Sequence, residues 1–484
     1  MRAFFLATGF WVTWLLAPTS FAALPPAISY HLLEGSYFLD ECLICGRPSI
    51  QRPVRGNFDL VDVSGDSNLA RFVVTNIDFT AVTDPLFRIR GAGVYEVTLR
   101  TNPVQRMEAI LDVNGETKVF TNKNDFIERL APMLYLQLIQ TQQNLVSFYS
   151  LEIVAAPLRD LWFSTRTNLV TTNGGVFAAG DFLSFSGRTV EAEAALIGRL
   201  GLMPGSGSRG LDAIFPLGSG EIGFSFQRDE FSETLGPLPH GDWISNGGTV
   251  LLTNRALLAN FEPQPVLPDY GLDAFFVTTN GDILFSTSTN FVSPRIGELS
   301  RGDILSYAVV NGKPTNQLVR TSQQLLARFH PLDSATNYGL DALYVWPSGE
   351  IWFSTESPFD DQLFGPVSDG DLLSDQGYLV YRNAELVRFF GARGNPRGYG
   401  LDALWIVTDV TASPSLPPRL RIAANAAGDV RLDWTAGGKA FQVEKALNVA
   451  GPYLPASIFL ATPSFVDSNA VKSKTSSFYR VRQW

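Results

Sequence analysis

Histidine, cysteine and charged residues are scarce in this chain. Its 484 residues include only three histidines and two cysteines, and Asp, Glu, Lys and Arg together make up 17%. Three histidines are too few for a convincing Ser-His-Asp set, and His31, His240 and His330 lack the paired spacing of zinc ligands. The sequence also has no Gly-x-Ser-x-Gly elbow, no Walker loop and no His-Glu-x-x-His motif, so it carries no familiar catalytic signature.

Positive charge is also in short supply. The formal net charge is −10, the isoelectric point is near 5.0, and no run is rich in Lys and Arg. Such a chain has nothing to compensate phosphate repulsion, so nucleic acid is not expected among its partners.

Long apolar runs are missing as well, and the one candidate lies at the N-terminus. The stretch "MRAFFLATGFWVTWLLAPTSFAA" has an apolar core from Ala3 to Ala17 and small residues, Ser20 and Ala22, at cleavage-site spacing. This pattern predicts a secretory signal peptide over residues 1–22, cut after Ala22. A membrane anchor is the alternative, but the apolar core is shorter than the roughly 20 residues that a span needs. We therefore expect a secreted, periplasmic or cell-surface protein without a transmembrane segment after signal cleavage.

The two cysteines form a Cys-x-x-Cys pair, Cys42 and Cys45, in "LDECLICGRP". Such a pair in an exported protein is a local disulfide, a redox pair or half of a zinc site. Asp40 and Glu41 directly before Cys42 should raise the pKa of its thiol, which disfavours a redox thiolate. We expect a small structural disulfide and no metal.

The residues that are abundant point to strands and turns. Phe alone supplies 35 residues, Gly 42 and Pro 29, whereas residues typical of helix surfaces are few. An all-β fold is expected, and a chain of this length should divide into two to four domains.

A Gly-Leu-Asp-Ala motif recurs in the second half of the chain. Its copies begin at Gly210, Gly271, Gly339 and Gly400, with spacings of 61, 68 and 61 residues, which is typical of a repeat architecture. Each complete unit continues with a Gly-containing turn and a run ending in Phe-Ser-Thr or a close variant, which together predict a hairpin. A Gly-Asp pair, further strands and a short piece such as "ELVRFF" follow, and that piece fits an outer strand or one to two helical turns.

The ends of the repeat region are offset from each other. An "LWFST" at residues 161–165 precedes the first Gly-Leu-Asp-Ala, and no second hairpin strand follows the last copy at residue 400. A ring explains this offset, because residues 401–407 can pair antiparallel with residues 161–165 and close the sheet edges. The sequence therefore predicts a four-bladed β-propeller with permuted strand closure over residues 159–409.

The Asp-Ala-apolar strand followed by Gly-x-apolar-x-Phe resembles the blade opening of hemopexin-like four-bladed propellers. The resemblance covers about two strands per blade, and the chain departs from that family by lacking a cysteine pair that locks the first and last blades. The whole repeat resembles secreted bacterial propeller-like repeat proteins, and this resemblance implies no particular activity.

Different domains are expected on either side of the repeats. Residues 24–157 alternate apolar and polar residues, which predicts an N-terminal β-sandwich with one possible short helix around "DFIERLAPMLYLQLIQ". A linker rich in Pro and Ser is expected at residues 411–418. Residues 419–484 contain "DVRLDW", "FQVEKA" and "SFYRVRQW", which resemble strands B, C and F of a fibronectin type III domain.

Each Gly-Leu-Asp-Ala copy should place one aspartate at the head of an inner strand, near the propeller axis. The leucine and alanine of each copy are expected in the innermost strands, because the axis of a small propeller admits only short side chains. Four carboxylates near one axis repel each other unless hydrogen bonds or a cation such as calcium neutralise them. We favour backbone N–H donors that hold one blade to the next, with calcium as the other reading. These residues are Asp212, Asp273, Asp341 and Asp402, beside Leu211, Leu272, Leu340, Leu401, Ala213, Ala274, Ala342 and Ala403. The aspartates of the Gly-Asp pairs should bind backbone N–H groups in the same way, and they are Asp181, Asp242, Asp303 and Asp371.

Two classes of function remain. The favoured one is a secreted binding or cell-surface structural protein, with no catalysis, whose partner is an extracellular protein or polysaccharide. The alternative is a carbohydrate-active enzyme that uses paired carboxylates in the propeller channel, with Asp229, Asp360 and Asp361 as further acidic candidates. A binding protein should show no clustered carboxylates with shifted pKa values in a pocket, whereas a glycosidase should show two of them roughly 5 to 10 Å apart.

Overall fold

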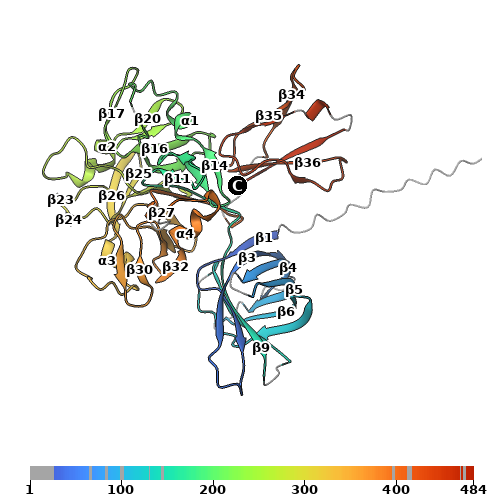
Figure 1. Ribbon diagram of the computed structural model, residues 1–484. Helices are drawn as coiled ribbons and strands as arrows, with labels where there is room; N and C mark the ends of the chain where they lie inside the picture. Colours follow the sequence, from blue (N-terminus) through green and yellow to red (C-terminus); the bar gives the residue numbers. More distant parts are fainter. Residues whose placement is uncertain are drawn as a thin grey trace, which may run out of the picture.

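The computed structural model describes residues 27–484 except for residues 65–67, 82–84, 99–102, 130, 143–145, 206, 395–397, 411–416, 469 and 473–475. The expected signal peptide and most of the expected linker lie outside the described residues. The chain is all-β, with three parts that follow one another in the sequence (Figure 1). Among the helices that the structure describes, none has both the length and the apolar character to span a membrane.

The N-terminal part is one sheet that closes on itself. Going round the sheet, the strand order is β1-β3-β2-β9-β8-β7-β6-β5-β4, and β3 also pairs with β4, which completes an eight-stranded barrel with β1 added beside β3 and β9. The strands are β1 (Ala27–Leu32), β2 (Tyr37–Glu41), β3 (Ile50–Asp62), β4 (Leu69–Ala81), β5 (Phe87–Thr98), β6 (Gln105–Val113), β7 (Glu116–Asn122), β8 (Leu134–Gln140) and β9 (Phe148–Ala156).

This barrel replaces the two-sheet sandwich that the alternating pattern predicted. The long strands β3 and β4 bend at register shifts, between Asn57 and Asp59 in one pair and between Val74 and Ile77 in the next. At Gly56 a Cβ would lie 2.1 Å from the Asp78 carbonyl oxygen, so only glycine permits this close approach. Such bulges curl a sheet until its edges meet, and sequence periodicity does not reveal them.

The prediction of a short helix within residues 125–140 is also wrong. Within this stretch the structure has β8, whose residues alternate between buried and half-buried. The sequence "LYLQLIQ" therefore has the period of two that a strand requires, and its leucines pack into the barrel core.

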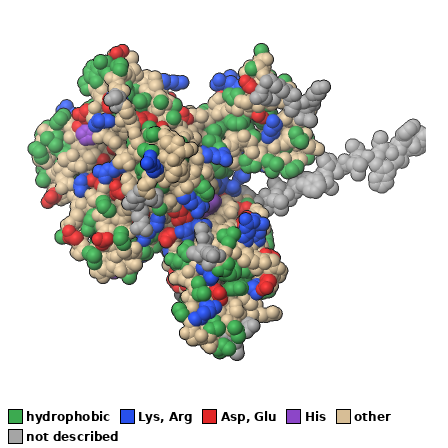
Figure 2. Space-filling view, in the orientation of Figure 1, with side chains coloured by type: hydrophobic (Ala, Val, Ile, Leu, Met, Phe, Trp, Pro, Cys, Tyr) green, Lys and Arg blue, Asp and Glu red, His purple; other side chains and the backbone are tan. Residues whose placement is uncertain are grey.

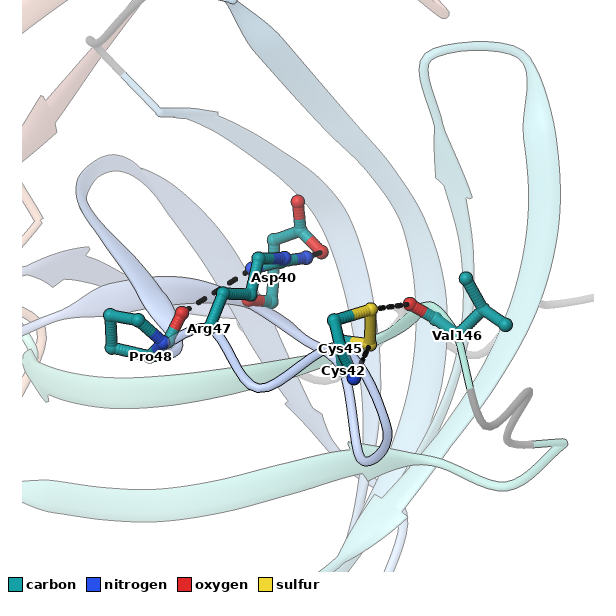
Figure 3. The surroundings of a disulfide bond; sticks show 6 residues. All are labelled: Asp40, Cys42, Cys45, Arg47, Pro48 and Val146. Carbon is teal, nitrogen blue, oxygen red and sulfur yellow. Dashed lines mark hydrogen bonds and ion pairs between the residues drawn. A yellow bond between two sulfur atoms is a disulfide. The ribbon is translucent and has the colours of Figure 1, made fainter.

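The predicted disulfide between Cys42 and Cys45 is present in the loop between β2 and β3 (Figure 3). The Cys45 backbone N–H donates to Cys42 Sγ over 3.0 Å, and Arg47 pairs with Asp40 over 2.9 Å beside it. The bridge closes an exposed turn, as expected of a structural disulfide.

The middle part, which we call the repeat domain, consists of four four-stranded sheets. Written from the first to the last strand of each sheet, they are β33-β10-β13-β14, β15-β16-β19-β20, β21-β22-β25-β26 and β27-β28-β31-β32. The strands are β10 (Asp160–Ser164), β13 (Phe182–Ser184), β14 (Arg188–Glu191), β15 (Leu211–Pro216), β16 (Ile222–Phe226), β19 (Trp243–Ser245), β20 (Thr249–Leu252), β21 (Phe275–Val277), β22 (Ile283–Phe285), β25 (Ile304–Val310), β26 (Lys313–Arg320), β27 (Leu343–Val345), β28 (Ile351–Phe353), β31 (Leu372–Ser374), β32 (Tyr378–Tyr381) and β33 (Ala403–Val407).

The predicted closure is confirmed, because β33 pairs antiparallel with β10, from Ala403 opposite Ser164 to Val407 opposite Asp160. The first strands of the sheets also contact each other in a closed circle, β15 with β21, β21 with β27, β27 with β33, and β33 with β15. The last strand of the domain thus completes the sheet that contains its first strand, which removes the exposed edges.

Short elements decorate the outside of this circle. The piece after each outer strand, left open between strand and helix, forms a helix of one turn or so: α1 (Glu193–Ile197), α2 (Asn254–Leu258), α3 (Ser322–Leu325) and α4 (Asn383–Leu386). Two-stranded ribbons lie between the second and third strands of each sheet: β11 (Leu169–Val170) with β12 (Val176–Phe177), β17 (Glu230–Ser232) with β18 (Gly236–Leu238), β23 (Phe291–Ser293) with β24 (Gly297–Leu299), and β29 (Phe359–Asp361) with β30 (Gly365–Val367).

The C-terminal part contains two three-stranded sheets around a small core. Trp434 and Phe441 pack edge to face in this core, with ring centroids 5.5 Å apart. The sheets are β34-β35-β38 and β37-β36-β39, formed by β34 (Leu420–Ala424), β35 (Val430–Trp434), β36 (Phe441–Ala446), β37 (Leu454–Pro455), β38 (Ser464–Asp467) and β39 (Phe478–Gln483).

One carboxylate joins all three parts. Asp409, just after β33, pairs with Arg159 over 2.8 Å and accepts hydrogen bonds from the Ser29 backbone N–H and the Trp484 indole N–H. Around these contacts, acidic and basic side chains are interspersed over the visible face of the molecule (Figure 2).

Candidate functional site

The Gly-Leu-Asp-Ala motifs lie where the four sheets of the repeat domain meet. All four leucines have 0% exposed surface, and the four alanines are buried as well, which agrees with their expected inner position. The motif therefore fixes the innermost layer of the repeat domain.

Hydroxyl groups of the Phe-Ser-Thr runs hold each sheet to the next. The serine of each run donates to the carbonyl oxygen of the motif leucine in the following sheet. The bonds are Ser164 to Leu211 (3.5 Å), Ser225 to Leu272 (2.9 Å), Ser286 to Leu340 (3.2 Å) and Ser354 to Leu401 (2.7 Å). These serines make the sheet-to-sheet contacts that we had expected the motif aspartates to make.

The four motif aspartates instead line one cavity of about 410 Å³, which we call the axial pocket. None of the described residues that line it is Phe, Tyr or Trp, and its walls carry acidic, basic, imidazole, amide and hydroxyl groups. The lining residues are Asp212, Asp273, Asp341, Asp402, Arg166, Thr167, Gln227, His240, Ser288 and Glu356. The structure thus brings together every aspartate of the first series.

Four of the other lining residues occupy one repeat position, directly after each Phe-Ser-Thr or Phe-Ser-Phe: Arg166, Gln227, Ser288 and Glu356. Each packs against the glycine of a motif. A Cβ at Gly271 would lie 2.1 Å from Ser288 Oγ, and one at Gly400 would lie 2.5 Å from Arg166 Cβ. The glycines therefore make room for this second set of side chains, which we call the variable ring.

The sequence analysis missed the variable ring because its members share no chemistry. Their common place in the repeat was the signal that could have found them. The pocket consequently combines a constant set of four aspartates with four side chains of different charge and length, which breaks the symmetry of the repeats.

Few protein donors reach the pocket carboxylates. Ser288 donates its hydroxyl to Asp273, and Gln227 donates its amide to Asp402 over 2.5 Å. Four other buried oxygens receive no hydrogen bond from an N–H or Ser/Thr hydroxyl group of the described residues: Asp212 Oδ1, Asp273 Oδ2, Asp341 Oδ2 and Glu356 Oε1. Asp212 contacts Asp402, and Asp273 contacts Glu356, at hydrogen-bond range, so each of these carboxyl pairs requires a shared proton.

Burial raises the pKa of all five carboxyl groups in the pocket. For Asp212 and Asp341 the charge of Asp402 adds to this burial, and both pKa values lie well above the ordinary range. Burial, followed by the charge of Asp273, raises the pKa of Glu356 to about 8. Burial raises the pKa of Asp402 to about 6, against the hydrogen bond from Gln227. Burial also raises the pKa of Asp273. The pocket therefore holds protons at neutral pH.

Two arginines offset part of this negative charge. Burial acts to lower the pKa of Arg166, but the charges of Asp341 and Asp402 raise it. The charges of Asp369 and Glu356 also raise it. Arg301 pairs with Glu356 Oε2 over 2.8 Å. Five carboxyl groups thus face two guanidinium groups.

A ring of aromatic side chains closes the other end of the channel. The third residue after each motif aspartate contributes one ring, and successive centroids lie 5.9, 5.2, 5.8 and 5.0 Å apart around the circle Phe215, Phe276, Tyr344 and Trp405. The expectation that only short side chains fit at the axis is wrong, because edge-to-face packing lets four aromatic rings fill it. The four rings therefore fill the centre of the circle of sheets, three residues further along the chain than the motif aspartates.

No group of three or more His, Cys, Asp and Glu side chains in the described part of the chain is arranged to hold a metal ion. The four motif aspartates offer the oxygen atoms that calcium prefers, but they do not converge in this way. The calcium site stays a prediction.

The aspartates of the Gly-Asp pairs accept backbone N–H groups, as expected, but these bonds lie within one repeat unit and do not join one sheet to the next. Each accepts the backbone N–H at the start of the outer helix in its own sheet: Asp181 from Glu193, Asp242 from Asn254, Asp303 from Ser322 and Asp371 from Asn383, over 2.8 to 2.9 Å. They stabilise the repeat and do not line the axial pocket.

The remaining acidic candidates are not paired for catalysis. Asp361 is buried and accepts backbone N–H groups of His330, Leu363 and Phe364, whereas Asp360 is exposed beside it. Asp229 lies 2.8 Å from Nδ1 of His240, which lines the pocket, and its side chain is exposed to solvent.

Comparisons with known proteins add little to this geometry. No protein-family model and no curated protein matches the chain. Among solved structures, the extracellular domain of a one-component system from B. thetaiotaomicron is 7% identical with a TM-score of 0.19, covering 91% of this chain and 75% of that one. The periplasmic gluconolactonase of Pseudomonas aeruginosa is 10% identical with a TM-score of 0.18, covering 91% of this chain and 99% of that one. Scores this low support no inference about the fold or the function of this chain.

Proposed function

We propose that this chain is an exported binding protein whose repeat domain is a four-bladed β-propeller and whose axial pocket captures a cationic ligand. The observation that carries the proposal is one cavity with five buried carboxyl groups, four oxygens of which receive no N–H or Ser/Thr hydroxyl donor. An unpaired buried acceptor is unfavourable, and a ligand that supplies donors and positive charge removes that penalty. Calcium is one such ligand, and an organic cation is the other.

Several features support the other parts of this proposal. Four four-stranded sheets in a closed circle are the arrangement of propeller blades, and the C-terminal pair of sheets around Trp434 supports a fibronectin type III-like module. A signal-like N-terminus and a disulfide both fit export to the periplasm or the cell surface. The cationic group would belong to an extracellular protein or a polysaccharide that bears amino groups.

A thermal unfolding series on the full chain tests this proposal. Calcium, magnesium, organic amines, neutral sugars and inorganic anions would each be added at increasing concentration, because a ligand that binds only the native state raises the melting temperature. We expect a shift with at least one class of cation and none with anions. Loss of that shift in Asp341→Asn, but not in Asp360→Asn, would place the ligand in the axial pocket. A chain whose melting temperature responds to none of these cations would refute the proposal.

The carboxyl groups with raised pKa values that cluster in the axial pocket were not expected in a binding protein, and they favour a second function, hydrolysis of a carbohydrate. A Glu356 carboxyl with a pKa of about 8 is protonated at neutral pH, as a general acid must be. Its neighbour Asp273 contacts it directly, whereas two-carboxylate hydrolysis needs a separation of roughly 5 to 10 Å, so the second carboxylate would have to come from across the pocket. Release of reducing ends from a polysaccharide panel, abolished in Glu356→Gln, would support this function. No release would leave the binding function alone.

A further inference from the structure

We propose that the axial pocket recognises a primary ammonium group at the end of an aliphatic chain, such as a lysine side chain or a diamine. This inference rests on the proposed cation-binding function and names the ligand class. It starts from the number and the placement of the acceptors that the protein leaves unpaired.

The number of acceptors matches the three N–H donors of an ammonium group. Asp212, Asp273 and Asp341 come from successive sheets, and each has one buried oxygen that no N–H or Ser/Thr hydroxyl group of the described residues reaches. Asp212 and Asp273 contact the carboxyl groups of Asp402 and Glu356, and their oxygens become full acceptors when the shared protons leave. Asp273 and Asp341 have only 8% and 7% of their surface exposed, so water does not readily donate hydrogen bonds to these oxygens. A primary ammonium carries three N–H donors that point in different directions, one for each of these aspartates.

The other oxygens of the site are already engaged and define its sides. Gln227 and the contact with Asp212 occupy the Asp402 carboxylate, and Ser288 occupies Asp273 Oδ1. Glu356 is held by Arg301 through Oε2, which leaves Oε1 as a further acceptor near Asp273. The variable ring thus places one carboxyl group, Glu356, and one guanidinium group, Arg166, beside the four aspartates.

Other cations fit these walls less well. Quaternary ammonium groups have no N–H donors and are recognised by the rings of Trp, Tyr or Phe, none of which is among the described residues that line the pocket. A single metal ion requires its ligands to converge within about 2.3 to 2.6 Å of one point, and the described aspartates are not grouped in this way. An ammonium group bridges more widely spaced oxygens, since each N–H···O contact spans about 2.7 to 2.9 Å.

Ammonium binding should release protons from the pocket. Two carboxyl pairs, Asp212 with Asp402 and Asp273 with Glu356, each hold a shared proton in the free protein. A bound cation neutralises the negative charge of both pairs, so the shared protons can leave. The other charged groups around the site are Arg166, Arg301, Asp369 and His240 with Asp229 and Asp269. Affinity should therefore rise as the pH increases from 5.5 to 8.

Isothermal titration calorimetry on the full chain tests the inference. The probes are Nα-acetyl-lysine methylamide, its Nε-trimethyl derivative, cadaverine and calcium chloride, each in two buffers of different ionisation enthalpy. We expect the amine to bind at least about tenfold more tightly than the trimethyl derivative and to release protons, because only the former donates hydrogen bonds. Asp341→Asn should weaken amine binding at least about tenfold, and the exposed Asp360→Asn should leave it unchanged.

The outcomes separate this inference from the proposed function. Equal binding of the amine and its trimethyl derivative, or binding without proton release, would overturn the ammonium assignment, and this comparison needs no variant. Binding of calcium without the amine would also overturn it while keeping the cation-binding function. Binding of none of the probes would refute both. Preference for the lysine derivative points to a protein ligand, and preference for cadaverine points to a free diamine; either result supports the ammonium site.

Discussion

Trp162 of β10 and Trp405 of β33 lie opposite each other in the strand pair that closes the repeat domain. Trp405 also contacts Phe215 and Tyr344 in the aromatic ring that seals the channel below the axial pocket. Trp405 therefore belongs both to the strand pair that closes the circle of sheets and to the aromatic ring at its centre. A substitution at Trp405 should affect both.

Trp405→Ala should lower the free energy of unfolding by about 3–5 kcal/mol, because it removes a buried aromatic side chain and leaves a cavity between three neighbours. Denaturant unfolding of the full chain measures this value. Phe389→Ala is the control, since Phe389 is 58% exposed and its loss should change the unfolding free energy by less than about 0.5 kcal/mol. Similar effects of the two substitutions would contradict a central role for the aromatic ring.

Ser354→Ala should destabilise the protein by about 1–3 kcal/mol. Ser354 donates to the Leu401 carbonyl and accepts from the Ala342 N–H over 2.9 Å, so its loss leaves two buried backbone groups unpaired. Ser348→Ala serves as the control, because Ser348 is an exposed turn residue with one long bond of 3.4 Å. A melting temperature of Ser354→Ala equal to that of the control would show that the sheets do not depend on these hydroxyl bonds.

The features that recur in every repeat could be predicted from the sequence, whereas the positions at which the repeats differ could not. The offset of "LWFST" against the last Gly-Leu-Asp-Ala was enough to predict the pairing of residues 161–165 with residues 401–407. Arg166, Gln227, Ser288 and Glu356 escaped because four different side chains at one repeat position form no motif. The barrel escaped because its closure depends on bulges near Asn57 and Val74, where local backbone geometry overrides the alternating pattern.

The contribution of the axial pocket to the stability of the ligand-free protein should fall as the pH rises from about 4 to 8. The pKa values of Asp402 and Glu356 are raised to about 6 and about 8, so the native state binds more protons than the unfolded chain across this window. Their contribution to stability is present below pH 4 and disappears as the pH passes through the raised values. Thermal unfolding at pH 4 to 8 measures the trend, and Asp341→Asn isolates the pocket, because it removes one of the mutually repelling carboxyl groups. The melting temperature of Asp341→Asn relative to the native sequence should increase with pH; a constant difference would contradict the assignment of protons to the pocket.

Lys439→Met should raise the melting temperature at pH 7. Lys439 of the C-terminal part places its Nζ 4.2 Å from the ring centroid of Phe215 and 5.0 Å from that of Trp405, on the aromatic ring that seals the channel. Burial lowers the pKa of Lys439 to about 8 and makes the charged form less favourable in the native state than in the unfolded chain, whereas the attraction of the rings acts in the opposite direction. The unfolded chain then binds more protons between pH 8 and the ordinary lysine pKa of 10.5, and the stability should rise with pH across that window.

Methionine keeps an unbranched side chain against the rings of Phe215 and Trp405 and removes the charge of Lys439. The expected gain at pH 7 is about 1–2 kcal/mol, because one pKa unit corresponds to about 1.4 kcal/mol and solvent screening removes part of the shift. Lys313→Met, at an exposed strand end, controls for the general effect of losing a positive charge. Thermal unfolding of both variants at pH 7 and pH 10 distinguishes the two contributions: the gain from Lys439→Met should shrink at pH 10, where Lys439 is already neutral. A lower melting temperature of Lys439→Met at pH 7 would mean that the cation–π attraction outweighs the burial of the charge, and that Lys439 fastens the C-terminal part to the repeat domain.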